Sequence, residues 1–183
     1  MTAGPFTLAP NTSIAYPDII GQLFDFEGFG ALAVVVSDPD AAIVMSRTFN
    51  SFSDGVNEGT FGQGLPGLKQ NDLVSANTKV RLVHLFEDES FRTNIGFLNA
   101  TGINLTVKAE FFTADGTSLG VRNVNIAPYG NMQWNRAFDL VTNENVTGGF
   151  VDVWTEAEDG LFYTYGSVAG EDNFSDPTTI LPQ

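Results

Sequence analysis

The sequence predicts an all-β protein of packed antiparallel sheets. Residues 103–111 alternate between apolar and polar side chains, which is the period of a strand with one buried face. Turn signals such as Asp115-Gly116 separate short segments of this kind. The 183 residues also include 16 Phe and 19 Gly, and that mixture of aromatic and turn residues is typical of sheets.

Composition excludes several classes of protein. A hydrophobic content of 43% argues against disorder, and the absence of cysteine excludes disulfides, thiolate chemistry and Cys–zinc sites. Eight basic residues against 22 acidic ones give a net charge of −14, so the cationic footprint of a nucleic-acid binder is missing. There is no apolar run of about 18 residues, so we expect no membrane insertion. The acidity suits a secreted or cell-surface protein.

A degenerate repeat is the main organising feature of the sequence. Leu8 opens a stretch that recurs from Ile126, an offset of 118 residues (126 − 8), and Leu65-Pro66 corresponds to Leu181-Pro182 at the far end. Apolar positions, turn glycines and acidic turns persist between the copies, which indicates tandem structural units. The two copies also share a short segment that we expect to form a helical turn, at 17–26 and at 135–141.

The first copy contains two segments with strand character. We expect residues 31–36 and 42–49 to pair around the turn 37–40. Little sequence with strand character precedes them, so we predict a partial β-sandwich at residues 1–72. It would be completed by a strand from elsewhere, by packing on the other domain, or by a missing upstream segment. Met1–Pro5 lacks signal-peptide features, so the protein is either cytosolic or a mature chain or excised fragment. We expect the latter, because the first copy of the repeat looks truncated.

A complete β-sandwich is predicted for residues 76–183. Its first strand, 79–86, is apolar on both faces, and a second is expected at 92–98. The segment 103–111 forms a hairpin with 118–126, where a change of phase indicates a β-bulge near Arg122-Asn123. The last two strands are 149–155 and 161–168, which we expect to pair around an acidic turn.

The order of these motifs resembles a known kind of module. The segments concerned are Phe91–Asn99, the hairpin ending at Ile126–Gly130, Ser46–Asn50, Gly59–Pro66 and Asp176–Thr179. Their order resembles that in tandem immunoglobulin-like β-sandwich modules of bacterial secreted and cell-surface proteins, and the resemblance implies a structural or adhesive role without catalytic residues.

Acidic turns provide the candidate metal ligands. Clustered carboxylates on loops can hold calcium, and the candidates are Asp38, Asp40, Glu156, Glu158 and Asp159. The alternative is that these are solvated turns of an acidic chain. Paired carboxylates could also serve a glycosidase, but no catalytic motif accompanies them, and His84 is interpreted as a structural residue of a strand. We expect no other cofactor and no enzymatic activity.

Four aromatic residues are candidates for an exposed platform that stacks on sugar rings. They are Trp134, Trp154, Tyr163 and Tyr165, and the alternative is that they fill the core. Trp154 should face away from Val151 and Val153. Five Asn-x-Ser/Thr sequences are candidate glycosylation sites, although Asn and Thr are also common in β turns: Asn11, Asn99, Asn104, Asn145 and Asn173.

The function predicted from these features is that of a non-enzymatic extracellular structural or adhesive protein. Its partners would be itself or other surface proteins, and the incomplete first unit suggests a filament assembled by strand donation. Residues 2–8 are the candidate donor strand. The alternative is a carbohydrate-binding module that uses exposed aromatic residues.

Overall fold

The computed structural model describes residues 1–28, 30–38, 40–53, 55–56, 58–171 and 177–183. The chain forms two compact units, residues 1–32 and 33–183. In the first unit, helix α1 (Ile19–Phe24) begins after Asp18, whose Oδ1 accepts a hydrogen bond of 3.0 Å from the Gly21 amide. It ends at Asp25, which adopts a left-handed conformation. This confirms the predicted helical turn at 17–26.

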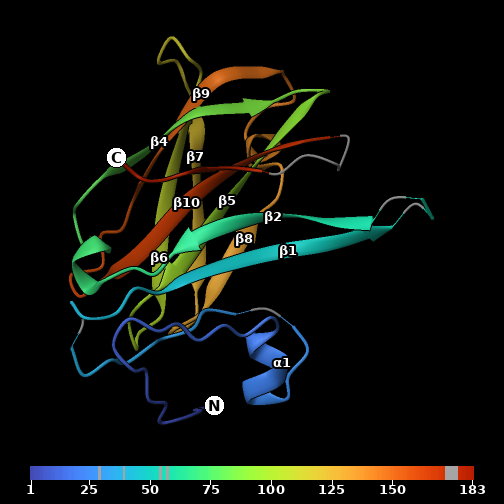
Figure 1. Ribbon diagram of the computed structural model, residues 1–183. Coiled ribbons are helices and arrows are strands. Elements are labelled where there is room, and N and C mark those ends of the chain that lie inside the picture. The colour runs from blue at the N-terminus through green and yellow to red at the C-terminus, as the bar shows by residue number, and fades with distance from the viewer. Residues whose placement is uncertain (29, 39, 54, 57, 172–176) are drawn as a thin grey trace. The chain divides into compact units, whose positions relative to one another are not determined.

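The second unit contains two antiparallel sheets whose strands come from residues 74–180 (Figure 1). One sheet has the order β11-β10-β5-β8, with β3 also paired to β10, and the other has the order β4-β9-β6-β7. The first sheet consists of β3 (Val74–Ser75), β5 (Phe91–Asn99), β8 (Asn131–Trp134), β10 (Leu161–Gly170) and β11 (Thr178–Ile180). The second consists of β4 (Val80–Glu87), β6 (Leu105–Phe112), β7 (Ser118–Ile126) and β9 (Val146–Trp154).

The inward faces of the two sheets form one apolar core. Strand β6 buries every second residue, as its alternating sequence predicts. Each sheet contributes large side chains that are fully or almost fully buried, and this packing confirms the all-β, sandwich-like fold class. The sheets contribute Phe97, Phe111, Phe162, Leu82, Leu85 and Ile95, and Phe138 joins this core from a 3₁₀ helix.

A separate hairpin accompanies the sandwich in the second unit. Strands β1 (Met45–Ser53) and β2 (Glu58–Pro66) pair in continuous register from Met45↔Pro66 to Ser53↔Glu58. The predicted partner of this region was wrong, because residues 31–36 form no strand. Alternation of side chains is a local property and does not specify which segment will supply the partner strand.

The last two long strands do not pair with each other. β9 pairs with β4 and β6, whereas β10 pairs with β3, β5 and β11. The acidic turn at 155–160 therefore crosses between sheets, and the predicted hairpin was wrong. A sequence of turn residues indicates that the chain reverses, but both a hairpin and a crossing between layers reverse it.

Two details of the remaining strands also differ from prediction. β4 is not buried on both faces, because Val83 is 40% exposed. It bulges at Val83 and His84, where His84 has a φ of 59°. The bulge in β7 lies at Leu119, opposite the step from Phe111 to Phe112, and not near Arg122-Asn123. Gly120, with a φ of 131°, accommodates the distorted backbone there.

The sequence repeat is only partly a structural repeat. Helix α1 and the 3₁₀ helix η2 (Ala137–Leu140) occupy equivalent positions, as predicted. However, β9 corresponds to residues 28–36, and none of the described residues there is in a strand. The two copies therefore adopt different structures, since only the second has neighbouring strands to pair with. The predicted division of the chain between residues 72 and 76 stays a prediction.

Candidate functional site

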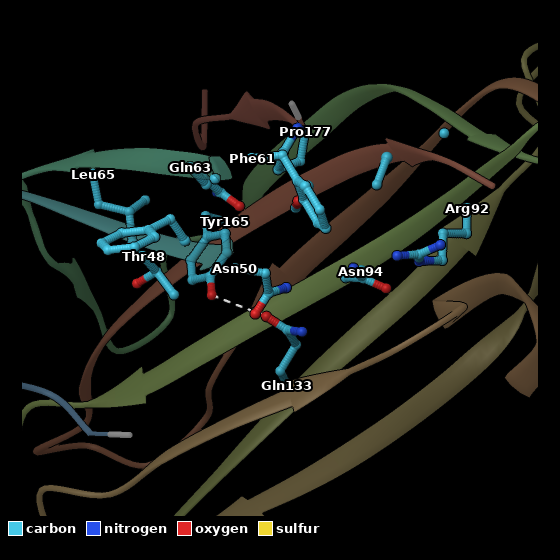
Figure 2. A pocket seen from close by; sticks show the side chains of 15 residues that line it. Thr48, Asn50, Phe61, Gln63, Leu65, Arg92, Asn94, Gln133, Tyr165 and Pro177 are labelled. Carbon is cyan, nitrogen blue, oxygen red and sulfur yellow. Dashed lines mark hydrogen bonds between the residues drawn. The ribbon is translucent and has the colours of Figure 1, made fainter. Parts of the chain in front are cut away.

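A cavity of about 210 Å³ lies between the β1–β2 hairpin and the outer face of the five-stranded sheet (Figure 2). None of its lining residues is Asp or Glu, although the chain has 22 acidic residues. The side chains that line it are instead amides, hydroxyls, aromatic rings and a single cation. The principal ones are Thr48, Asn50, Phe61, Gln63, Arg92, Asn94, Gln133, Tyr165 and Ser167.

Strand alternation explains why these side chains face outward. On β10, Phe162 and Thr164 point into the core, so Tyr165 and Ser167 project from the opposite face. The Tyr165 hydroxyl donates a hydrogen bond of 3.1 Å to Gln133 Oε1. Burial raises the pKa of the Tyr165 phenol.

The amides of the cavity differ in how completely they are bonded. Gln133 accepts from Tyr165 and donates through Nε2 to Asn135 Oδ1 at 2.8 Å. Asn94 Oδ1 accepts from the backbone amide of Arg136 at 3.3 Å. By contrast, Gln63 Nε2 is buried and has no hydrogen-bond partner.

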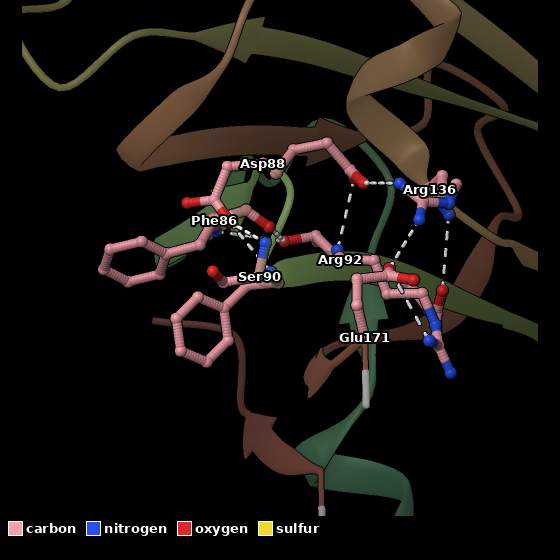
Figure 3. A network of polar contacts seen from close by, with 10 residues as sticks. Phe86, Asp88, Ser90, Arg92, Arg136 and Glu171 are labelled. Atoms are coloured by element: carbon pink, nitrogen blue, oxygen red, sulfur yellow. Dashed lines mark hydrogen bonds and ion pairs between the residues drawn. The ribbon is translucent and has the colours of Figure 1, made fainter. Parts of the chain in front are cut away.

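An ionic network adjoins the cavity at Arg92 (Figure 3). The Glu171 carboxylate lies 3.6 Å from Arg92 Nη1 and 2.6 Å from Arg136 Nη2. Arg136 also contacts Glu87 at 3.3 Å. The charge of Arg92 is therefore balanced by a carboxylate that does not line the cavity.

Glu87 is the most perturbed acid of this network. Its side chain is buried at 4% exposure and accepts hydrogen bonds from Thr93 and from Arg136. The pKa of Glu87 is raised from 4.5 to about 7. Burial is the largest cause and the charge of Asp139 adds to it, while the hydrogen bond from Thr93 and the charge of Arg136 partly offset them. Loss of hydration of the carboxylate outweighs its ion pair.

The four predicted aromatic residues do not form one platform. Trp134 packs into the core against Phe97, with ring centroids 4.8 Å apart. Tyr163 and Tyr165 lie together on the outer face of β10 with ring centroids 6.4 Å apart, and Tyr165 alone of the four lines the cavity.

Trp154 lies on the other sheet. It faces away from Val151 and Val153, as predicted, and Lys79 Nζ stands 4.2 Å from the centroid of its ring. Phe150, two residues earlier on the same face, is covered by Arg81 at 4.1 Å. Cations therefore occupy the ring faces that a sugar would stack on.

The predicted calcium ligands are dispersed. Asp40 forms an ion pair of 2.6 Å with Lys69, and Glu156 forms one of 2.7 Å with Lys108. The hydrogen bond and the charge of Lys108 lower the pKa of Glu156. Glu158 and Asp159 are exposed, and no three acidic or histidine side chains of the described residues gather in a group that could hold a metal ion. Calcium binding stays a prediction.

The candidate glycosylation sites differ in accessibility. Asn11, Asn104 and Asn145 are exposed, and Asn173 lies outside the described residues. Asn99 is fully buried in the folded chain, and its glycosylation stays a prediction. Its Nδ2 donates to the carbonyls of Ile103, Ile126 and Ala127, and its Oδ1 accepts from Thr101.

Most cavity residues escaped the sequence analysis. Arg92 and Asn94 are the outward positions of a correctly predicted strand, so alternation alone could have identified them. Gln63 and Gln133 carried no such signal, because their importance depends on the hairpin lying over the sheet.

None of the helices in the described residues is long and apolar enough to span a membrane. No family model matches the chain, and no curated protein and no solved structure matches it either.

Proposed function

We propose that this chain is a non-enzymatic, extracellular structural or adhesive protein of immunoglobulin-like type that assembles with copies of itself by strand addition. The observation that carries this proposal is an apolar segment without a strand partner. Between residues 33 and 44 the described residues form no strand, yet Val35 is 95% exposed and Ile43 is 92% exposed.

Segments of this composition are stable when they are paired. β-branched residues such as Val34, Val35 and Ile43 favour a pleated, half-buried surface, and full exposure forgoes about 1.5–3 kcal/mol for each large aliphatic side chain. A strand from another molecule would cover these side chains and bond the free backbone groups.

The adjoining hairpin offers an edge for the same contact. In the part of the chain that the structure describes, β1 and β2 pair only with each other, and a two-stranded sheet is marginally stable alone. A third strand would extend it. Residues 2–8 remain the candidate donor, because they form no secondary structure and expose Phe6 and Leu8 on alternate positions.

Light scattering after size-exclusion chromatography, with negative-stain microscopy, tests the proposal. We expect oligomers whose size grows with protein concentration. Ile43→Lys and a deletion of residues 1–8 should each reduce the size of these oligomers. Val121→Lys is the matched control, since it places the same charge at an exposed valine of β7. A chain that stays monomeric at every concentration, or variants that assemble like the wild type, would contradict strand addition.

Carbohydrate binding is the second candidate, and it is favoured by the amide-rich cavity beside Tyr165. Binding to a glycan array would support it. If sugars instead stack on the exposed ring of Trp154, the variant Trp154→Ala should lose glycan binding while keeping its fold.

A further inference from the structure

We propose that the cavity under the β1–β2 hairpin binds a single neutral sugar ring. The inference rests on the carbohydrate-binding candidate for the class of ligand, and it does not depend on assembly. Of the four aromatic candidates it keeps Tyr165, which lines the cavity, and it leaves out Trp154, which lies on the opposite sheet.

The size of the cavity restricts the ligand. Its volume of about 210 Å³ is below the roughly 300–1,000 Å³ of pockets for drug-sized ligands. A single ring of a glycan, held while the rest of the chain extends into solvent, is an appropriate occupant.

The chemistry of the lining selects hydroxyl groups. Each hydroxyl of a sugar both donates and accepts a hydrogen bond, and side-chain amides do both as well. Four amides line the cavity, together with the hydroxyls of Thr48 and Ser167. The amides come from both walls: Asn50 and Gln63 from the hairpin, Asn94 and Gln133 from the sheet.

The balance of charge favours a neutral ligand. No lining residue is acidic, so a cation finds no counter-charge in the cavity. The one cationic residue, Arg92, lies 3.6 Å from Glu171, which offsets its attraction for an anion. Phe61 and Tyr165 also line the cavity, and their aromatic rings provide apolar surface for the C–H groups of a sugar.

Gln63 indicates where a ligand would bond. A buried donor without a partner loses its hydration and gains no bond in return, and Gln63 Nε2 is such a donor. The neighbouring Tyr165–Gln133–Asn135 chain is complete within the protein. An acceptor oxygen on a ligand would therefore satisfy Gln63 without breaking an existing bond.

The test uses the full chain in an NMR titration with a panel of neutral methyl glycosides, and with glucuronate as the acidic arm. We expect saturable binding of at least one neutral glycoside, with shifts at Gln63 and Gln133. Gln63→Met, which keeps the size of the side chain but lacks its donor, should weaken binding by roughly tenfold. Asn123→Ala, an exposed amide of β7 outside the cavity, should bind like the wild type.

Thermal unfolding distinguishes loss of binding from loss of fold. Gln63→Met should unfold at the same or a higher temperature, because it removes an unbonded buried group. Binding that survives Gln63→Met but disappears in Trp154→Ala would show that the cavity is not the binding site, while carbohydrate binding itself would stand. Binding of glucuronate alone would overturn the neutral ligand, and the absence of binding by any glycoside or glycan would overturn both.

Discussion

The ring of Tyr165 lies directly on Gly96, its cross-strand partner. A β-carbon added to Gly96 would stand 2.2 Å from Tyr165 Cε1, so only glycine leaves room for the ring. The hairpin repeats this arrangement at Gly59, where an added β-carbon would stand 2.8 Å from the ring of its partner Phe52. Glycines that weaken an isolated strand here allow aromatic rings to lie flat on the sheet.

Gly96→Ala should therefore displace Tyr165 and lower the free energy of unfolding by about 2 kcal/mol, the usual cost of overpacking. The hydrogen bond from Tyr165 to Gln133 should be lost with it. Chemical denaturation measures the first effect, and the NMR signals of the Gln133 side-chain amide report the second. Gly64→Ala is the control, since its nearest neighbour would be 4.0 Å away. Equal stability of the two variants would contradict the contact.

Asn99→Ala should be among the most destabilising single changes, at about 3 kcal/mol. The variant leaves the carbonyls of Ile103, Ile126 and Ala127 and the amide of Thr101 without the side chain that joins them. Urea denaturation checks the loss. Asn104→Ala, an exposed asparagine in the same loop region, should change stability by less than about 0.5 kcal/mol. A small effect at Asn99 would show that water replaces the amide.

Glu87 should make stability depend on pH near neutrality. Its folded-state pKa of about 7 lies above the ordinary 4.5, so the folded protein holds this proton more tightly than the unfolded chain does. The resulting stabilisation is complete below pH 4.5 and is lost as pH rises through 7, by about 3 kcal/mol at most. Denaturation of wild type and Glu87→Gln at pH 5 and pH 8 checks it.

In Glu87→Gln the decline between pH 5 and pH 8 should be smaller than in the wild type. Arg136 keeps its ion pair with Glu171 in this variant, so the arginine still has an acidic partner. Glu89→Gln, an exposed acid two residues away, should follow the wild-type curve. The same decline in Glu87→Gln and wild type would mean that Glu87 does not titrate in this range.

Arg81→Met should destabilise the outer face of the four-stranded sheet. Arg81 bonds Asp152 through Nε at 2.6 Å and Nη2 at 2.9 Å, and its guanidinium covers Phe150. Asp152 is only 5% exposed, so the variant leaves a buried carboxylate without its partner. Because Arg81 is itself half-exposed, we expect a loss of about 1 kcal/mol. Asp152→Asn should recover part of the stability in the double variant, and no recovery would argue against the ion pair.

The sequence by itself determined the long strands between residues 80 and 170, the hairpin at 105–126 and the helical turns. These follow from local rules, because alternation in 105–112 defines a buried face and Asp115-Gly116 favours a tight reversal. The same rules correctly placed Trp154 on the face opposite Val153.

Only the tertiary structure decided which strands became neighbours. The turn after Trp154 crosses to the other sheet, and residues 31–36 have the composition of a strand but no partner. Burial of Asn99 and the unbonded amide of Gln63 likewise depend on segments distant in sequence. Hydrogen bonding between strands depends on which segments meet in space, and the alternation of side chains along one segment is compatible with many partners.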